Sequence, residues 1–445
     1  MKRKLYACIL AAIMTVTMTA CGNASSTSGA ADSAEEPAAA DTASASGSTE
    51  ASDAASGQGP AASGETVSFS FCQAQPEYQT AAQNLINAYM EEYPNVTIEL
   101  ITDISNLTTE LQAGNIPEIF YTEGYTVMED YADYITDLSD QPWVDSLLDS
   151  SLEAVTMDGK VVGFPTTFSG EGICYNKKMF EEHGWEVPTT RTELLALCEQ
   201  IQAEGITPFT NQFADDWLIG QLMSGAAYTH IPDTQQFTDD LYAGTVNLAD
   251  TEQMQLIFDI LDIMLEYGTP DPLSYSWNEA CSSFATGQTA MLFEGDWIWS
   301  TIEPIDPEIE VGMFPVPTSD NPDENRLLAD VNMVLHVGKG SEQPEAAIEF
   351  LNWLATSDTA KDILLTQYQF IPCFEGWEYE GANQLAAATK EYLDSGMTYQ
   401  WWWNKWPNNY RPTAGQELQK YIDGELTAEE TLQAMDLDWD NMTTQ

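Results

Sequence analysis

Tryptophans stand directly beside acidic residues at several places in this sequence. Residues 295–299 read Gly-Asp-Trp-Ile-Trp, residues 215–217 read Asp-Asp-Trp, and residues 401–403 are three consecutive tryptophans. An indole face covers an apolar ligand surface, whereas a carboxylate accepts hydrogen bonds from hydroxyl groups. The combination fits a ligand with flat C–H faces and a rim of hydroxyls, such as a pyranose. The alternative is that the rings only pack in a hydrophobic core.

The two alternatives are weighed ring by ring. Most of the 13 tryptophans belong in a core, and we place Trp299 and Trp353 there. Trp217 and Trp297 are expected to contact a ligand. Three consecutive indoles cannot all face one core, so at least one of residues 401–403 is expected to be exposed.

The charge balance limits the class of partner. The chain has 445 residues, with 14 Lys and Arg against 71 Asp and Glu, and a net charge of -57. A surface this negative repels phosphates and nucleic acid at long range. The composition therefore excludes nucleic-acid and phosphosugar ligands, and a neutral or cationic ligand fits better.

The N-terminus has the pattern of an export signal. Residues 2–4 are basic, residues 5–18 are mostly apolar, and residues 18–22 read Met-Thr-Ala-Cys-Gly, which resembles a bacterial lipoprotein signal. We predict a signal peptide over residues 1–20 and lipidation of Cys21; the alternative is an ordinary cleaved signal peptide. Residues 22–64 contain no large apolar residue, so residues 21–64 are predicted to be a disordered Ala/Ser/Gly linker.

The cysteines and histidines do not indicate a metal site. Once the two N-terminal cysteines are set aside, an odd number remains and no C-x-x-C occurs, which favours buried free thiols over a disulfide framework. The chain has only three histidines. The five remaining cysteines are Cys72, Cys174, Cys198, Cys281 and Cys373.

The pattern after the linker predicts an α/β fold. Residues 67–71 and 96–100 alternate apolar and polar side chains, as half-buried strands do. Between them, apolar residues over 78–93 recur at helical spacing. This β-α-β order indicates a parallel sheet covered by helices, and residues 119–121 are predicted to add a buried strand.

Later segments continue the alternation without an internal repeat. Thr190 with Glu193 and Thr427 with Glu430 are predicted capping boxes at helix starts, and Pro344 is predicted at a first helical position. Further strands are expected in residues 161–164, 311–314 and 331–337. The length is sufficient for two α/β lobes.

Several stretches resemble, in order, the family 1 extracellular solute-binding proteins of ABC importers. They occur in the family's order and spacing over most of residues 65–445, and include Gly-Lys-Val-Val-Gly-Phe-Pro followed by Cys-Tyr-Asn-Lys. They are residues 159–165, 174–177, 187–195, 284–299, 311–317 and 346–354. The resemblance implies a two-lobed type II periplasmic-binding-protein fold, in which each lobe is a mostly parallel sheet flanked by helices and the ligand cleft lies between the lobes. The first lobe would comprise 65–169 with 329–372, and the second 170–328 with 373–445.

The resemblance also implies ligand-binding positions. Trp297 stands where the family presents a stacking tryptophan. Ser169 stands where the family has a carboxylate, with Glu171 two residues further on. The full predicted set is Gln73, Gln75, Tyr121, Glu123, Ser169, Glu171, Asp216, Trp217, Asp296, Trp297, Trp402 and Trp403.

The predicted function is capture of a neutral di- to tetrasaccharide by hinge closure and its delivery to ABC permease subunits. The resemblance implies a monomeric receptor on the extracellular face of the bacterial cell membrane, anchored through Cys21, with no enzymatic activity, cofactor, metal or nucleic-acid partner. One alternative is a secreted glycoside hydrolase, because carboxylates beside aromatic rings also suit acid–base chemistry. Another is the same fold with a peptide or polyamine as ligand.

Overall fold

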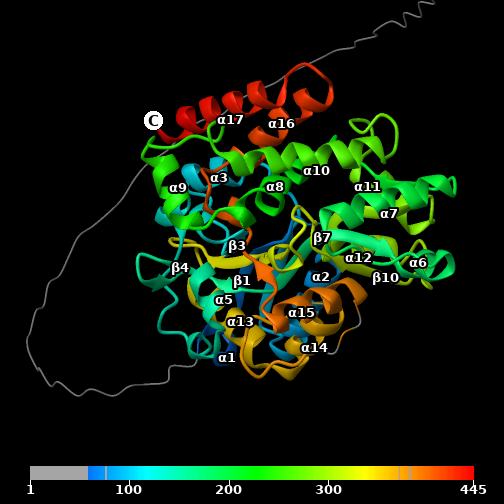
Figure 1. The fold of residues 1–445 in the computed structure, drawn as a ribbon. Helices are drawn as coiled ribbons and strands as arrows, with labels where there is room; N and C mark the ends of the chain where they lie inside the picture. The colour runs from blue at the N-terminus through cyan, green and yellow to red at the C-terminus, as the bar shows by residue number, and fades with distance from the viewer. Residues whose placement is uncertain (1–58, 76–77, 370, 380, 382, 445) are drawn as a thin grey trace, which may run out of the picture. The chain divides into compact units, whose positions relative to one another are not determined.

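The computed structural model describes residues 59–75, 78–369, 371–379, 381 and 383–444 (Figure 1). The predicted signal peptide, Cys21 and most of the predicted linker lie outside these residues. Within the described part of the chain, none of the helices combines the length and the apolar character needed to span a membrane.

The first sheet has five strands in the order β2-β1-β3-β12-β6. Strand β1 pairs in parallel with β2 and β3, which confirms the predicted β-α-β opening, and β12 pairs antiparallel with β3 and β6. The strands are β1 (Val67–Cys72), β2 (Val96–Ile101), β3 (Ile119–Thr122), β6 (Phe164–Pro165) and β12 (Val334–Val337). A separate two-stranded ribbon consists of β4 (Thr156–Met157) and β5 (Lys160–Val161).

Helices cover this sheet through an aromatic core. Tyr89 packs edge-on against Phe350, with ring centroids 5.0 Å apart, and Phe350 also contacts Phe71 at 5.8 Å. Trp353 is 6% exposed and belongs to the same core, as predicted. The helices that contribute buried residues include α2 (Gln79–Glu92), α13 (Pro344–Thr356) and α14 (Asp358–Thr366).

The second sheet has six strands built around the long strand β7. One edge of β7 pairs with β9, whereas the other pairs with β11 over its first half and with β10 over its second half. The strands are β7 (Phe168–Asn176), β8 (Thr207–Thr210), β9 (Thr289–Gly295), β10 (Val311–Phe314), β11 (Leu327–Val331) and β13 (Thr398–Tyr399).

Both sheets are mixed, so the prediction of mostly parallel sheets was wrong in this respect. In the second sheet, β7 is antiparallel to β9, β10 and β11, and only the β8–β9 and β11–β13 pairs are parallel. The reason lies in the connections, because strands that pass from one sheet to the other enter the second sheet against the direction of their neighbours.

Two direct strand connections join the sheets. The chain passes from β6 to β7 at residues 165–168 and returns from β11 to β12 at residues 331–334. These crossings are hydrogen-bonded to each other, since Thr166 N donates to Met333 O and Asn332 N donates to Thr167 O, both at 2.9 Å. A third connection follows α14, where Phe168 N donates to Ile371 O at 3.0 Å.

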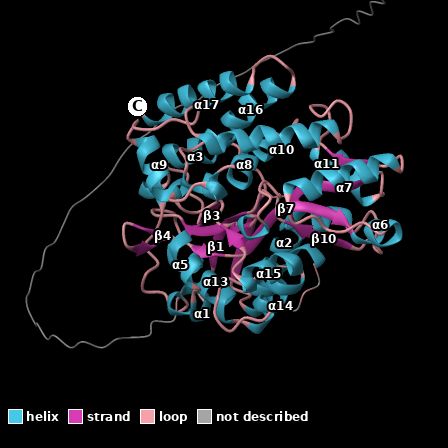
Figure 2. Ribbon diagram, viewed as in Figure 1, coloured by secondary structure: helices cyan, strands magenta, loops and turns pink. Residues whose placement is uncertain are grey.

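Helices also surround the second sheet (Figure 2). Helix α16 packs against both α8 and α17. The longer helices are α6 (Lys177–His183), α7 (Arg191–Ala203), α8 (Asp216–Ala226), α9 (Thr234–Tyr242), α10 (Gln255–Glu266), α11 (Trp277–Ala285), α15 (Gln384–Ser395), α16 (Tyr410–Ile422) and α17 (Ala428–Thr443). Helix α12 (Trp299–Ile302) also packs on this side, whereas α3 (Leu107–Ala113), α4 (Thr126–Glu129) and α5 (Asp149–Ala154) pack against the first core.

A short helix lies inside the predicted linker. Helix α1 (Pro60–Ser63) has Pro60 in its first turn and buries Ala61, whose backbone N donates to Glu349 Oε2 at 2.7 Å. The prediction of a disordered segment was therefore wrong for residues 60–63, because this side-chain partner on α13 satisfies the free N–H of the helix start.

The predicted helix starts differ in detail. Thr427 and Glu430 form a complete capping box at α17, as predicted. Thr190 caps α7, but Glu193 accepts hydrogen bonds from the N and Oγ1 of Thr189 instead of returning to Thr190. Pro344 is the first residue of α13, as predicted.

The predicted free thiols are confirmed: all five cysteines after the linker are buried and unpaired. Trp299 is buried, as predicted. The expectation that one of residues 401–403 is exposed was wrong, because Trp401, Trp402 and Trp403 are 3%, 6% and 4% exposed. A 3₁₀ turn, η8 (Trp402–Lys405), rotates successive side chains by about a third of a turn, so each indole meets different neighbours.

Candidate functional site

A cavity of about 430 Å³ is lined by four indole rings and lies between elements of both sheets. Its volume falls within the range of small-molecule binding pockets. We call it the indole pocket, and its lining residues are Gln75, Glu123, Trp217, Gln221, Trp277, Trp297, Asn332, Trp401 and Arg411.

One wall comes from the first sheet. Gln75 follows β1 and Glu123 follows β3, so both lie beyond the carboxyl ends of neighbouring parallel strands, where α/β sheets place ligand contacts. Gln73 does not line the pocket, but it holds the backbone of Gln75 in place, since Gln73 Oε1 accepts a hydrogen bond from Gln75 N at 3.0 Å. Asn332 joins the lining from the crossing between β11 and β12.

The opposite wall comes from helix starts around the second sheet. Trp217 lies in the first turn of α8, and Gln221 lies one turn later on the same helix. Trp277 is the first residue of α11, behind a capping box formed by Ser276 and Glu279. Arg411 lies in the first turn of α16. Of these helix starts, only that of α11 carries a side-chain cap, which holds Trp277 at a defined position.

Close approaches of the backbone position this wall. A Cβ added to Gly220 on α8 would lie 2.2 Å from Arg411 O, and one added to Gly415 on α16 would lie 1.9 Å from Asp216 O. Only glycine permits this helix spacing, which brings Trp217 and Gln221 beside Arg411. Similarly, a Cβ on Gly295 would meet the ring of Trp297 at 2.2 Å.

The indoles form a continuous aromatic surface. Trp297 lies edge-on to Trp401, with centroids 5.9 Å apart and planes at 83°. Trp401 stacks on Trp403 at 5.1 Å and 23°, and the guanidinium carbon of Arg411 lies 5.9 Å from the centroid of Trp403. These contacts restrict the rotamers of Trp401 and Arg411, so both are held in place without a ligand.

Four residues of the pocket lining carry a buried polar atom that has no hydrogen-bond partner in the described part of the chain. Among the described residues, Gln75 Oε1 and Gln221 Oε1 are buried acceptors without a hydrogen bond, and Trp277 Nε1 and Trp401 Nε1 are buried donors without one. All four belong to lining residues. Because buried polar groups normally have partners, these atoms indicate a ligand that both donates and accepts hydrogen bonds.

The charged residues of the lining form an ion pair. Arg411 donates from Nη1 and Nη2 to the two carboxylate oxygens of Glu123, at 2.9 and 3.0 Å. This bidentate geometry is the strongest form of the pair. It leaves the lining without an unpaired charge, which suits an uncharged ligand.

Two further carboxyl groups are buried beside the indoles. Glu171 is 1% exposed, and neither of its oxygens has a partner among the described residues. Burial, followed by the nearby Glu294, raises the pKa of Glu171 well above its usual range, although Arg411 opposes this shift. Glu294 accepts from Gln212 Nε2 and Gly295 N, and burial raises its pKa to about 8.

Four of the predicted residues meet in the indole pocket: Gln75, Glu123, Trp217 and Trp297. Ser169 and Asp296 lie with Trp297 around a smaller space of about 200 Å³, which we call the polar hollow. Asp296 Oδ2 accepts from Gly170 N at 2.8 Å and from Thr389 Oγ1 at 2.9 Å, and burial raises its pKa to about 7. Ser169 Oγ accepts from Asn332 Nδ2 at 3.2 Å.

Other predicted residues are placed around these spaces. Tyr121 and Trp403 line a hollow of about 280 Å³, which we call the distal hollow. Trp402 donates from Nε1 to Thr238 Oγ1 at 2.6 Å and lies under the ammonium group of Lys405. Asp216 accepts from Gln416 Nε2 at 2.9 Å, so its carboxylate faces α16.

Sequence reasoning did not select Gln221, Trp277, Asn332, Trp401 or Arg411. The sequence does contain a signal for Trp277. It follows Ser276 in a Ser-x-x-Glu capping box, which predicts a helix start, just as the acidic pair before Trp217 does. The triple tryptophan indicated a ligand contact in residues 401–403, but the predicted set contained Trp402 and Trp403 instead of Trp401. No motif surrounds Arg411 in the sequence, and its pairing with Glu123 depends on how α16 packs.

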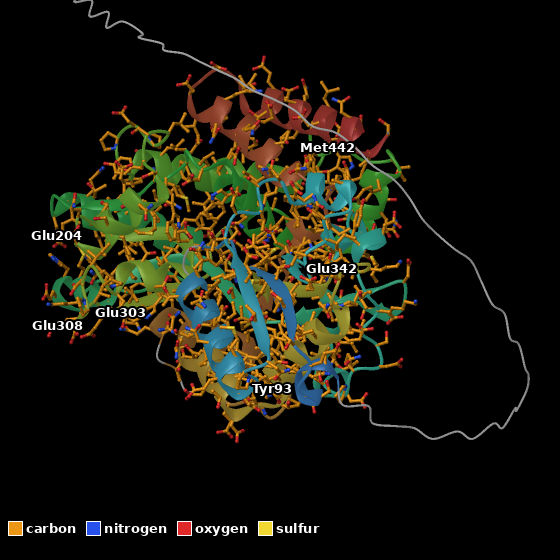
Figure 3. The ribbon with its side chains drawn as sticks, turned by 180° about the vertical axis from the view of Figure 1, so that it is seen from behind. Tyr93, Glu204, Glu303, Glu308, Glu342 and Met442 are labelled. Carbon is orange, nitrogen blue, oxygen red and sulfur yellow. The ribbon has the colours of Figure 1, made fainter. Side chains whose placement is uncertain are left out.

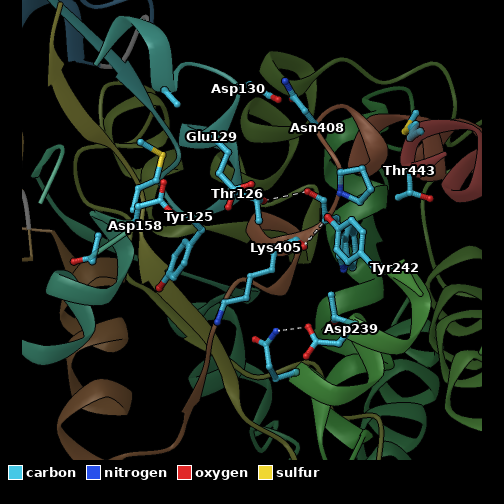
Figure 4. Close-up of a pocket in the computed structure, with 18 of the residues that line it drawn as sticks. Tyr125, Thr126, Glu129, Asp130, Asp158, Asp239, Tyr242, Lys405, Asn408 and Thr443 are labelled. Atoms are coloured by element: carbon cyan, nitrogen blue, oxygen red, sulfur yellow. Dashed lines mark hydrogen bonds between the residues drawn. The ribbon is translucent and has the colours of Figure 1, made fainter. Parts of the chain in front are cut away.

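A larger space of about 900 Å³, the acidic hollow, lies elsewhere (Figure 4). Glu129, Asp130, Asp158 and Asp239 line it together with Lys405. We favour the smaller indole pocket as the site, because it combines several indole faces with buried unpartnered polar atoms. Within the described residues, no group of three or more His, Cys, Asp or Glu side chains is arranged to hold a metal ion.

Comparison with known proteins agrees with this geometry. Residues 84–391, more than half of the chain, match the family described as bacterial extracellular solute-binding protein. The multiple sugar-binding protein of Streptococcus mutans serotype c is 22% identical over 303 residues, which cover 66% of this chain and 72% of that protein. The melibiose/raffinose/stachyose-binding protein MelE of Bacillus subtilis is 23% identical over 304 residues, covering 63% and 68%.

A similar solved structure confirms the fold class. The solute-binding protein RafE in complex with raffinose superimposes with a TM-score of 0.74 at 20% identity, covering 85% of this chain and 100% of that chain. The fold is the two-lobed α/β type II fold of periplasmic binding proteins, as the resemblance implied, with mixed sheets.

Proposed function

Because the chain belongs to the bacterial extracellular solute-binding proteins, we propose that it captures an oligosaccharide in the indole pocket for an ABC importer. The observation that carries this proposal is the pairing of four indole rings with unpartnered donors and acceptors in one cavity. Indole faces cover the C–H faces of pyranose rings, and hydroxyl groups both donate and accept hydrogen bonds. The names of the multiple sugar-binding protein, of MelE and of the raffinose complex of RafE support the same ligand class.

Capture would proceed by hinge motion. The lining includes residues that follow β1 and β3 of the first sheet and residues of α8, α11 and α16, which pack around the second. We propose the predicted lobes, residues 65–169 with 329–372 and residues 170–328 with 373–445, with their boundaries shifted. Residues 168–169 and 329–331 belong to strands of the second sheet, and Cys373 and Phe374 pack in the first core. A rotation at the crossings would change the distance between the pocket walls, and a ligand that contacts both walls favours the closed state.

A direct binding measurement tests this function. We expect isothermal titration calorimetry of the purified protein with melibiose, raffinose, stachyose and chitin oligosaccharides to show saturable binding to at least one of them. A bound sugar would also raise the melting temperature, since it binds only the folded state. If neither these sugars nor those of any other oligosaccharide series produce heat or a thermal shift, the proposal fails.

The protein would release its ligand chemically unchanged. We therefore expect no reducing sugar to appear when the protein is incubated with a ligand at stoichiometric concentration. Release of reducing sugar would instead favour the glycoside hydrolase alternative. Competition of spermidine or a peptide with the bound sugar would favour the alternatives that keep the fold and change the ligand.

We propose that Cys21 carries a lipid that holds the protein at the extracellular face of the cell membrane, where it acts as a monomer and meets its permease. The family supports an extracellular location. The resemblance of residues 18–22 to a lipoprotein signal supports the lipid anchor at Cys21. Expression of the full chain in bacteria with labelled palmitate, followed by membrane fractionation, should label the wild type and leave Cys21→Ala unlabelled and released from the membrane.

A further inference from the structure

The ion pair of Glu123 and Arg411 separates two adjoining spaces. Both residues line the indole pocket, and both also line the distal hollow. Glu123 follows β3 of the first sheet, whereas Arg411 lies on α16, which packs with the second core. The ion pair therefore links the first-sheet side to the second-sheet side, and it lies where the indole pocket adjoins the distal hollow.

The pair is held in place on both sides. The Arg411 guanidinium is bound bidentately and lies over Trp403, which stacks on Trp401. The backbone O of Glu123 accepts from Asn404 Nδ2 at 3.3 Å. The two charged side chains are 38% and 21% exposed, which leaves the pair accessible at the wall. The bidentate geometry and the packing of the guanidinium therefore fix the two side chains where the two spaces adjoin.

The distal hollow offers the same chemistry as the indole pocket. Tyr121, Tyr131 and Trp403 contribute rings, and Asn408 and Asn409 contribute amides or backbone polar groups. The hollow has a volume of about 280 Å³ against about 430 Å³ for the indole pocket. A sugar ring that passed the ion pair would meet aromatic faces and hydrogen-bonding groups on the other side.

We propose that the Glu123–Arg411 pair is a partition that sets the length of the bound oligosaccharide, which rests on the proposed sugar-binding function. With the pair formed, the ligand ends at the wall of the indole pocket. With the pair broken, the indole pocket and the distal hollow join, and a ligand longer by one ring is accommodated. Glu123 and Arg411 are thus specificity-determining residues.

The test compares affinities for melibiose, raffinose and stachyose, which add one ring at a time, by calorimetry. The variants are Arg411→Met, which removes the charge, and Glu123→Gln, which keeps the size of the side chain and the arginine. We expect the ratio of affinities for the longer over the shorter sugar to rise by about tenfold in both, a typical discrimination from one pocket contact. If the wild type binds another sugar series, the same ratio is measured there.

Lys405→Met is the matched control. Like Arg411, Lys405 forms an ion pair between the 400–411 segment and the first-sheet side, since its Nζ lies 3.2 Å from Glu153. Unlike Arg411, it lines the acidic hollow (Figure 4). We expect the ratio of affinities for the longer over the shorter sugar to be the same in Lys405→Met as in the wild type. Glu123→Gln covers the case in which Arg411→Met fails to fold, and thermal melting identifies that case.

The outcomes separate the two proposals. If the wild type binds sugars but all lengths lose affinity equally in the Glu123 and Arg411 variants, the pair only holds the two sides together and the partition is wrong. The same conclusion follows if Lys405→Met changes the ratio as much as they do. If the wild type binds no sugar at all, the proposed function fails and the partition fails with it.

Discussion

At the scale of single residues, the predictable part of the site is the aromatic side chain next to a turn. Trp217 and Trp297 were selected because each follows acidic residues at a helix or strand end, and both line the indole pocket. Trp401 lines the pocket, whereas Trp402 faces Thr238. Local sequence patterns do not show which of the three indoles lines the pocket, because that depends on where the 3₁₀ turn begins.

Trp297 is the residue that we expect to carry the most binding energy. It lines both the indole pocket and the polar hollow and meets Trp401 edge-on. Replacing it by alanine removes a ring face from two adjoining spaces. We expect Trp297→Ala to weaken sugar binding by about 2 kcal/mol or more, the cost typical of a central tryptophan anchor, measured by calorimetry.

Trp377→Ala controls for a general effect of losing an indole. Trp377 is also partly exposed and stacks on Phe374 at 4.9 Å, but this contact belongs to the first core. Its replacement should leave the sugar affinity unchanged even if it lowers stability. Equal affinities of the wild type and Trp297→Ala would remove this tryptophan from the site.

At the scale of elements, local patterns identified individual helices and strands but not how the strands pair. The β1-α2-β2 unit was predictable because its alternation and its helical period are written in adjacent residues. The direction in which β7 and β12 enter their sheets depends on partners more than a hundred residues away. For the same reason, the position of Arg411 follows from the contact between α16 and α8 and from no local pattern.

The glycine contact between α8 and α16 gives a prediction about this element pair. A methyl group on Gly220 or Gly415 would press against a backbone carbonyl of the other helix, and a backbone cannot rotate away as a side chain can. We expect Gly220→Ala and Gly415→Ala each to destabilise the protein by about 1–3 kcal/mol, as overpacking does. Urea unfolding measures the loss, and calorimetry should show weaker sugar binding as Trp217 moves away from Arg411.

Gly225→Ala is the comparison within the same helix. Its added Cβ would lie 3.3 Å from Leu328 Cδ1, the movable end of a side chain, and alanine favours the helical conformation by about 1 kcal/mol over glycine. We expect this variant to be as stable as the wild type or more so. Equal losses at all three glycines would mean that the close approach is not what matters.

At the scale of the whole molecule, the excess of carboxylates governs the response to pH. Acidic side chains such as Glu204, Glu303 and Glu308 stand at the surface (Figure 3), and the net charge of -57 makes the folded state repel itself. The buried carboxyls add a separate effect. Burial raises the pKa of Asp296 and of Asp330 from 3.8 to about 7, and that of Glu294 from 4.5 to about 8.

The sign of the effect follows from proton counting. Between the ordinary and the raised pKa values, these carboxyls bind more protons in the folded than in the unfolded state, so their contribution to stability is present at low pH and is lost as the pH rises to about 8. His336 acts in the opposite direction, because burial lowers its pKa from 6.5 to about 4. Most of its contribution changes below pH 6.5, and burial lowers the pKa of His230 in the same direction, so the carboxyls dominate the range from pH 6.5 to pH 8.

We therefore expect the melting temperature to fall by about 2 °C or more between pH 6.5 and pH 8, in high salt that screens the surface charge. Asp296→Asn removes one of the titrating groups while keeping the size of the side chain, so its melting temperature should depend less on pH. Asp320→Asn is the control, because hydrogen bonds from Thr192 lower the pKa of Asp320 and keep it ionised throughout this range. A melting temperature that is flat with pH in the wild type, or a slope that Asp296→Asn and Asp320→Asn change equally, would contradict the assignment to the buried carboxyls.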